Sequence, residues 1–216
     1  MTDIKTLRPG ERFMFKGYEW ICLEPNHPDG GVLAIMAEPW AKEMRFCPDK
    51  SYADEKGNWN NYRTSLIRKK LNGTLVDELG ADDLIPHEID LAADDGDGSY
   101  GTVEDLVFIL TSDEYRKHRD FLLHYNDWIW TASPGQCGYE YTDIGYTRSI
   151  RYVYTGAELV DGHGLGSYAV VPACILNPAS TNLRPSALRP SALRPSALRL
   201  SSNLRQSMAC VEEVSE

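Results

Sequence analysis

The chain has 216 residues, of which 42% are hydrophobic and 25% charged, and its formal net charge at pH 7 is −10. This composition is typical of a globular protein and allows one domain with a substantial core, or one domain with an appendage. Phosphate groups repel so acidic a surface, so we expect the main domain to bind no nucleic acid. Apolar runs of transmembrane or signal-peptide length are missing, so we expect no membrane insertion and a place in the cytoplasm or in a particle assembled there.

The first part of the sequence predicts three short strands. Residues 11–15, 19–23 and 32–36 are rich in apolar side chains. Gly17 and the Pro-Asp-Gly-Gly sequence at residues 28–31 separate them, and glycine supplies the positive φ that tight turns need. We therefore expect the chain to open as a meander of strands.

A helix is predicted next, over residues 63–73. Leu66, Ile67 and Leu71 recur at helical spacing, and basic residues occupy the other face and the last turn. The Asn-Gly pair that follows Leu71 predicts the end of this helix.

The polar, acidic stretch that follows this helix and ends in residues 94–101 predicts a long loop. An EF-hand requires oxygen ligands at positions 1, 3 and 5, glycine at position 6 and glutamate at position 12. Aligned on Gly98, Asp95, Asp97 and Glu104 meet positions 3, 5 and 12, but position 1 is Ala93. We therefore favour a solvated loop over a calcium site.

The remaining elements are a buried strand at residues 106–110, a helix from Thr111 to Phe121 and a last strand at residues 168–176. Thr111 followed three residues later by Glu114 has the spacing of a capping box. The last strand contains Pro172, and proline in a strand indicates an edge or a bulge.

Catalytic and metal sites find little support in the sequence. Five cysteines are scattered without a C-x-x-C spacing, which predicts free, mostly buried thiols and no zinc site: Cys22, Cys47, Cys137, Cys174 and Cys210. The five histidines are isolated, and none has the spacing that pairs a base with a nucleophile. We expect no catalytic residue, metal or cofactor, although an enzyme with an unrecognised site stays an alternative.

The best candidate for a binding site is the aromatic, glycine-rich segment 128–154, because Tyr and Trp give a large contact area at low entropic cost. The same rings suit a core equally well. We assign Trp130 and Ile150 to the core. Ligand-binding residues are predicted to be Tyr139, Tyr141, Asp143, Tyr146, Arg148 and, in a loop-like Asp-Gly-His-Gly sequence, His163.

After Pro178 the character of the sequence changes. The sequence Leu-Arg-Pro-Ser-Ala occurs three times in succession at residues 183–197, and residues 183–205 hold five arginines and no acid. Proline disfavours helix, and a five-residue period matches neither helix nor strand. We therefore expect an extended or disordered tail at residues 181–216, or an arm that lays residues 183–205 on an acidic neighbouring subunit.

The order of short motifs resembles a domain family of phages and gut bacteria. Its counterparts here are Gly17-Tyr18-Glu19-Trp20, Trp59, the Ile67–Gly73 helix, residues 108–114, Trp130-Thr131-Ala132-Ser133-Pro134 and Ala169-Val170-Val171-Pro172-Ala173. Ala132 and Val171 depart from the pattern, because the family has arginine there.

The resemblance implies a C-type-lectin-like fold over residues 1–180, an α+β class with small antiparallel sheets and two main helices, related to formylglycine-generating enzymes. Catalytic members of that wider fold use a close cysteine pair, which this sequence lacks. The implied function is therefore display of binding loops to a protein or glycan ligand, by a phage or prophage structural or receptor-binding protein of the virion or bacterial cytoplasm. A retroelement-diversified display protein is a special case, and an architectural virion subunit that docks through its C-terminal arm is the alternative.

Overall fold

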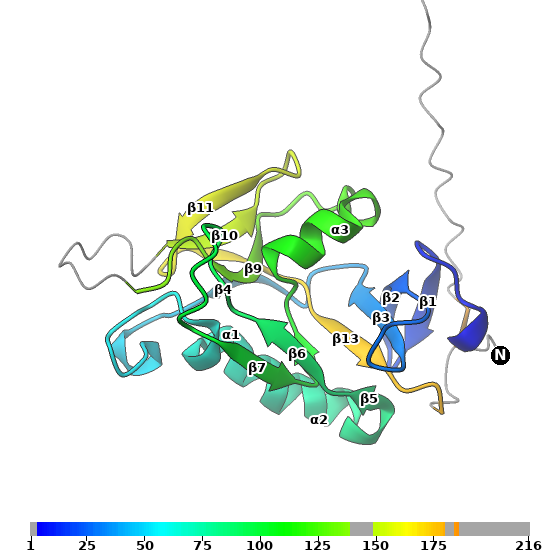
Figure 1. The fold of residues 1–216 in the computed structure, drawn as a ribbon. Helices are drawn as coiled ribbons and strands as arrows, with labels where there is room; N and C mark the ends of the chain where they lie inside the picture. Colours follow the sequence, from blue (N-terminus) through cyan, green and yellow to red (C-terminus); the bar gives the residue numbers. More distant parts are fainter. Residues whose placement is uncertain (1–3, 139–148, 180–183, 186–216) are drawn as a thin grey trace, which may run out of the picture.

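The computed structural model describes residues 4–138, 149–179 and 184–185. Their fold is mixed α+β, with two larger sheets, one two-stranded hairpin and one long α-helix (Figure 1). The predicted α+β class is confirmed. Buried apolar side chains from Ile4 to Leu176 join into one core cluster. No helix in this part of the chain is long and apolar enough to cross a membrane.

The first sheet contains the predicted meander. Its strand order is β14-β1-β2-β3-β13-β5, and β8 also pairs with β13. The bounds are β1 Arg12–Phe15, β2 Tyr18–Glu24, β3 Val32–Met36, β5 Leu84–Ile85, β8 Val107–Phe108, β13 Ala173–Leu176 and β14 Arg184–Pro185. The pairings in this sheet are antiparallel.

The second sheet has the order β11-β10-β9-β12-β4. Its strands are β4 Ala41–Arg45, β9 Ile129–Pro134, β10 Ser149–Val153, β11 Leu159–His163 and β12 Ser167–Val170. One pairing differs from the expected antiparallel sheets, because β12 runs parallel to β9 with Ala169 opposite Ile129. The chain passes from β12 in this sheet to β13 in the first through Val171 and Pro172, so the proline lies between two strands.

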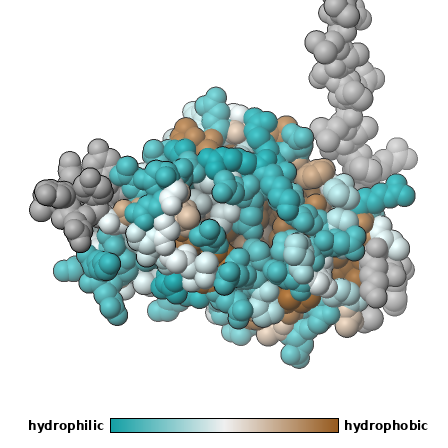
Figure 2. All heavy atoms as spheres, in the orientation of Figure 1, coloured by the Kyte–Doolittle hydropathy of each residue, from teal (hydrophilic) through white to brown (hydrophobic). Residues whose placement is uncertain are grey.

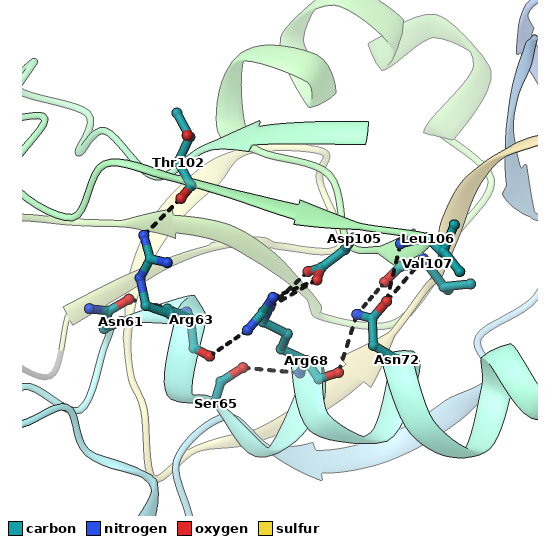
Figure 3. A network of polar contacts seen from close by, with 9 residues as sticks. All are labelled: Asn61, Arg63, Ser65, Arg68, Asn72, Thr102, Asp105, Leu106 and Val107. Carbon is teal, nitrogen blue, oxygen red and sulfur yellow. Dashed lines mark hydrogen bonds and ion pairs between the residues drawn. The ribbon is translucent and has the colours of Figure 1, made fainter. Parts of the chain in front are cut away.

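The predicted helix is longer than expected and is not one regular helix. Helices α1 (Leu66–Lys70) and α2 (Val76–Leu79) flank a π-helical segment, Leu71–Leu75. The predicted stop after Leu71 is therefore wrong. The Asn72 side chain donates to Val107 O at 2.9 Å and accepts from Leu106 N at 3.2 Å, which ties this turn to β8 (Figure 3). A tertiary contact thus overrides the local Asn-Gly signal.

The long helix, α3 (Ser112–Leu122), begins where the sequence predicts. The Thr111 side chain accepts from Glu114 N, and the Glu114 side chain accepts from Thr111 N, so the capping box is confirmed. α3 contacts β2 of the first sheet and β9 of the second and so joins the two sheets. The resemblance implies two main helices, whereas this part of the chain has one long α-helix and the composite segment.

A hairpin of β6 (His87–Asp90) and β7 (Thr102–Asp105) encloses the acidic loop. The prediction of a long loop is confirmed for residues 94–101, to which no helix or strand is assigned. It is wrong for the earlier part of the acidic stretch, where α2, β5 and β6 form. The molecular face in Figure 2 is mostly hydrophilic, with hydrophobic residues in small separate patches. Of the predicted tail, only β14 is described, and it pairs with β1; the other residues of 181–216 lie outside the described residues.

Candidate binding surface

The second sheet has one face under α3 and one face that carries aromatic side chains. Ile129 and Val153 line a small apolar cavity together with Tyr115 and Leu122 of α3. Successive side chains of a strand point to opposite faces, so Tyr152 lies on the face away from α3.

Five aromatic rings form a row on that second face. The ring centroids of Trp130 and Tyr168 lie 4.3 Å apart, and those of Tyr168 and Tyr152 lie 4.5 Å apart. Trp128 continues the row, at 5.6 Å from Tyr152 and 5.2 Å from Tyr154. The row starts inside, at Trp130 (1% exposed), and reaches solvent at Trp128 (40%) and Tyr154 (41%).

The inner end of the row is fixed by a hydrogen bond and by close packing. Trp130 Nε1 donates to Met44 O at 2.7 Å, and the Trp130 ring packs on Phe46 at 5.5 Å. A Cβ atom on Gly162 would lie 2.7 Å from the Tyr152 ring and 3.0 Å from the Tyr168 ring. Gly162 therefore gives these rings the room to stack on the strand beside them, a role that its sequence neighbourhood did not reveal.

The aromatic segment 128–154 was interpreted either as a binding surface or as part of the core, and its described residues divide between buried and exposed positions. Trp130 and Ile150 are 1% and 0% exposed, so their assignment to the core is confirmed. Tyr152 is also buried, whereas Trp128 and Tyr154 are exposed. The five predicted ligand-binding residues from Tyr139 to Arg148 lie outside the described residues.

Both ends of segment 139–148 are held by one buried asparagine. Asn60 is 0% exposed, and its amide donates to Gln136 O at 2.7 Å and to Ser149 O at 2.9 Å. Tyr100 donates its hydroxyl to Asn60 Oδ1 at 2.7 Å and accepts from Gly138 N at 3.0 Å. The residues on either side of the segment are therefore fixed by the interior of the domain.

The Asp54 carboxylate fixes the two asparagines on either side of Asn60 in the sequence, Asn58 and Asn61. Asp54 accepts hydrogen bonds from Asn58 N, Asn58 Nδ2 and Asn61 Nδ2, at 2.9, 2.8 and 3.1 Å. Burial raises the pKa of Asp54, but these hydrogen bonds outweigh it and hold that pKa below its ordinary value. Asn58 in turn fills the space beside Gly138, where a Cβ atom would lie 2.4 Å from Asn58 Oδ1.

His163 is the one predicted ligand-binding residue that lies within the described part of the chain. It is the last residue of β11 and not part of a loop. It is exposed, and its Nδ1 accepts from Leu165 N at 3.1 Å. The register pairs His163 with Ser149, while Gly162 pairs with Ile150. Strand alternation therefore places His163 on the opposite face from the aromatic row.

The isolated histidines of the sequence are not all isolated in space, which corrects the sequence analysis. His27 and His87 have ring centroids 5.2 Å apart, and Asp29 Oδ2 lies 2.7 Å from His87 Nδ1 and 3.5 Å from His27 Nδ1. Within the described residues, these three side chains form a group able to hold a metal ion. No local pattern signals it, because His87 is 58 residues from Asp29.

Charge in this histidine group is set by burial and by carboxylates. Burial lowers the pKa of His27. Burial also lowers the pKa of His87, but its hydrogen bonds to Glu114 and Asp29 outweigh burial and raise that pKa.

The described cysteines are suited to packing rather than to chemistry. Cys22, Cys47, Cys137 and Cys174 are buried and form no disulfide, which confirms the prediction for them, and Cys210 lies outside the described residues. Burial raises the pKa of Cys22 to about 12 and also raises that of Cys174. Because the thiolate is the nucleophile, neither is activated for attack at neutral pH.

Comparison with known proteins adds no relative: no family model, curated protein or solved structure matches the chain. We therefore infer function from the residues themselves.

Proposed function

We propose that the chain is a non-enzymatic binding protein with a C-type-lectin-like fold, a structural or receptor-binding component of a phage or prophage. Its ligand binds the aromatic face, defined as Trp128, Tyr152, Tyr154 and Tyr168. The observation that carries the proposal is that Trp128 and Tyr154 are 40% and 41% exposed while their rings pack against each other at a centroid distance of 5.2 Å. Rings already fixed by stacking lose little conformational entropy when a ligand arrives.

A glycan fits this face better than a protein does. Two rings of this face, those of Trp128 and Tyr154, are exposed, whereas a stable protein interface buries about 800 Å² on each partner. Aromatic faces carry negative charge density and attract the C–H groups on one face of a sugar ring. The hydroxyls of the exposed Tyr154 and the half-buried Tyr168 offer hydrogen bonds to sugar hydroxyls.

The display of segment 139–148 is the second part of the proposal. Asn60 holds the chain on both sides of this segment, as a scaffold for binding loops requires. Tyr139, Tyr141, Asp143, Tyr146 and Arg148 stay predicted ligand-binding residues, and the location in a virion or bacterial cytoplasm stays a prediction too. The C-type-lectin-like fold is supported by β13, which returns the end of the domain beside β3.

Replacing Trp128 by alanine is expected to lower the affinity for a glycan at least tenfold, because the outer ring of the row is lost. The probe is an oligosaccharide array followed by calorimetry with the sugars that bind. Leu123→Ala is the matched control, since Leu123 is also an exposed large apolar residue, 48% exposed, on another element. Leu123→Ala should unfold within about 0.5 kcal/mol of the wild type, as exposed positions do. Trp128→Ala should lose about 1–2 kcal/mol, because its ring contacts to Tyr152 and Tyr154 are removed, and both variants should be folded at the temperature of the assay. The glycan proposal is contradicted if no oligosaccharide on the array binds, or if Trp128→Ala and the wild type bind with equal affinity.

One observation favours a second function, docking through the C-terminal arm. Arg184 and Pro185 belong to the first Leu-Arg-Pro-Ser-Ala repeat, and they pair with Met14 and Phe13 on the outer edge of β1. An open sheet edge is a ready template for another strand. The pairing of these two residues with β1 supports the proposal that residues 183–205 add as a strand to a neighbouring subunit that offers such an edge.

Deletion of residues 181–216 is expected to convert any assembly of the full chain into monomers if the arm docks on a neighbour. Size-exclusion chromatography with light scattering measures the mass of both forms. A second deletion, of residues 186–216, keeps β14 and separates the role of the paired residues from that of the later repeats. Unchanged mass in both deletions excludes docking through the arm.

A further inference from the structure

Three chain segments meet at the histidine group described above. His27 and Asp29 belong to the turn between β2 and β3, which is closed by hydrogen bonds from His27 N to Gly31 O at 2.8 Å and from Gly30 N to His27 O at 2.9 Å. His87 is the first residue of β6, and Glu114 is in the first turn of α3. The turn therefore presents two side chains to a third that comes from a distant part of the sequence.

The distances within the group suit a metal ion of the zinc class. One ligand atom from each of His27, Asp29 and His87 lies within 4.8 Å of the other two. Zinc bonds to nitrogen and oxygen are about 2.0–2.2 Å long, so two ligand atoms of a tetrahedral site lie roughly 3.3 Å apart. Asp29 Oδ2 and His27 Nδ1 are already 3.5 Å apart, and the 2.7 Å contact of Asp29 with His87 needs to open only slightly.

A carboxylate orients the central histidine. Glu114 Oε1 lies 2.9 Å from His87 Nε2, and the other oxygen, Oε2, accepts from Thr111 N at 2.7 Å. The Phe108 ring packs against His87 with a centroid distance of 4.7 Å. His87 Nδ1 faces Asp29 at 2.7 Å, and loss of its proton on metal binding would leave its lone pair directed to the ion while Nε2 donates to Glu114. Metal-binding histidines commonly donate their other ring N–H to a carboxylate in this way.

Exposure and charge also fit a bound dication. The side chains of His27 and His87 are 10% and 12% exposed, whereas that of Asp29 is 36% exposed. The two imidazoles are thus shielded, and the carboxylate edge leaves a position open to water. Asp29 and Glu114 supply two negative charges to balance the ion, while the nearby Glu24 is already paired with Lys117 and His118.

We propose that His27, Asp29 and His87 bind one Zn²⁺ or a similar divalent transition metal, with Glu114 as the positioning residue of His87. The ion joins the β2–β3 turn, β6 and, through Glu114, the first turn of α3. Three protein ligands leave a fourth position for water or for a ligand atom. The site is independent of the aromatic face.

The test uses the full chain after treatment with EDTA and dialysis. Calorimetry with ZnCl₂ is expected to give one site with a Kd below about 10 μM, and Co²⁺ should give the visible absorption bands of a tetrahedral site. Thermal unfolding should shift to higher temperature with Zn²⁺, because the ion binds the folded state. Absence of all three signals overturns the proposal.

Variants locate the ion. His87→Gln and Asp29→Asn should each weaken Zn²⁺ binding at least 100-fold, and Glu114→Gln, which keeps a capping-box residue, should weaken it about 10- to 100-fold. His124→Gln, which removes a histidine outside the group, should bind as the wild type does. Circular dichroism in EDTA establishes whether each variant is folded. If His87→Gln does not fold, the zinc affinity of Asp29→Asn alone tests the site. Wild-type affinity in a folded Asp29→Asn or His87→Gln variant contradicts the site.

Discussion

Replacement of Asp105 by alanine is expected to lower the free energy of unfolding by about 3 kcal/mol, because it leaves the Arg68 guanidinium without its partner. Arg68 Nε and Nη2 donate to Asp105 Oδ1 at 3.0 and 2.7 Å (Figure 3). The Asp105 side chain is 2% exposed and that of Arg68 is 29% exposed. Partial access of Arg68 to water keeps the loss at the lower end of the range for buried ion pairs.

The position of this ion pair explains why its loss should be large. Arg68 Nη1 also donates to Arg63 O at 3.0 Å, and Arg63 Nη2 donates to Thr102 O at 2.7 Å. Together with Asn72, these bonds attach the composite helical segment to β7 and β8 (Figure 3). A lost carboxylate therefore weakens the contact of two elements rather than one local bond.

Urea unfolding measures the effect as a lower midpoint at unchanged slope. The matched control is the double variant Arg68→Met with Asp105→Leu, which removes both charges and fills their space. Burial raises the pKa of Asp105 in spite of Arg68, so desolvation opposes the pair strongly. The double variant should then lose less than Asp105→Ala alone. A larger loss in the double variant would show that the pair itself, and not the unpaired charge, dominates.

Sequence patterns predicted those features that depend on near neighbours. The capping box needs only Thr111 and Glu114, and the strand meander needs only apolar runs separated by turn residues. The assignment of Trp130 and Ile150 to the core is also confirmed. These signals act within a few residues, so the rest of the fold does not override them.

Features that depend on contacts between residues far apart in the chain could not be predicted from the sequence. Asn72 was expected to end a helix, yet its amide bonds to β8, 35 residues away at Val107, and the helical segment continues. The histidine group joins a turn to a strand 58 residues later, and no spacing rule covers such a distance. Trp128 is exposed because α3 covers the other face of the second sheet. The alternation of residues in the sequence does not indicate which face a helix will cover.

The buried amide of Asn60 leads to the sharpest prediction for the scaffold. Asn60→Asp exchanges an amide donor for an oxygen that faces Gln136 O and Ser149 O, both carbonyl acceptors. At neutral pH the variant should lose about 3–5 kcal/mol of the free energy of unfolding, since the buried charge keeps only the Tyr100 hydroxyl as a donor while its second oxygen faces two acceptors. Asn126→Asp introduces the same charge at an exposed position and should change that free energy by less than about 0.5 kcal/mol.

The pH dependence distinguishes an electrostatic cause from a packing defect. The introduced carboxyl lies among acceptors in a fully buried position, so its pKa in the folded state is expected to rise above the ordinary value of about 4. A raised folded-state pKa means that the penalty is absent below the unfolded-state pKa and grows as pH rises toward the folded-state value. Urea unfolding of the Asn60→Asp variant and the wild type at pH 7.5 and pH 5 should therefore show a smaller difference at pH 5. An equal difference at both values would mean that the lost amide matters only for its shape, and that Asn60 does not hold the two ends of segment 139–148 through its hydrogen bonds.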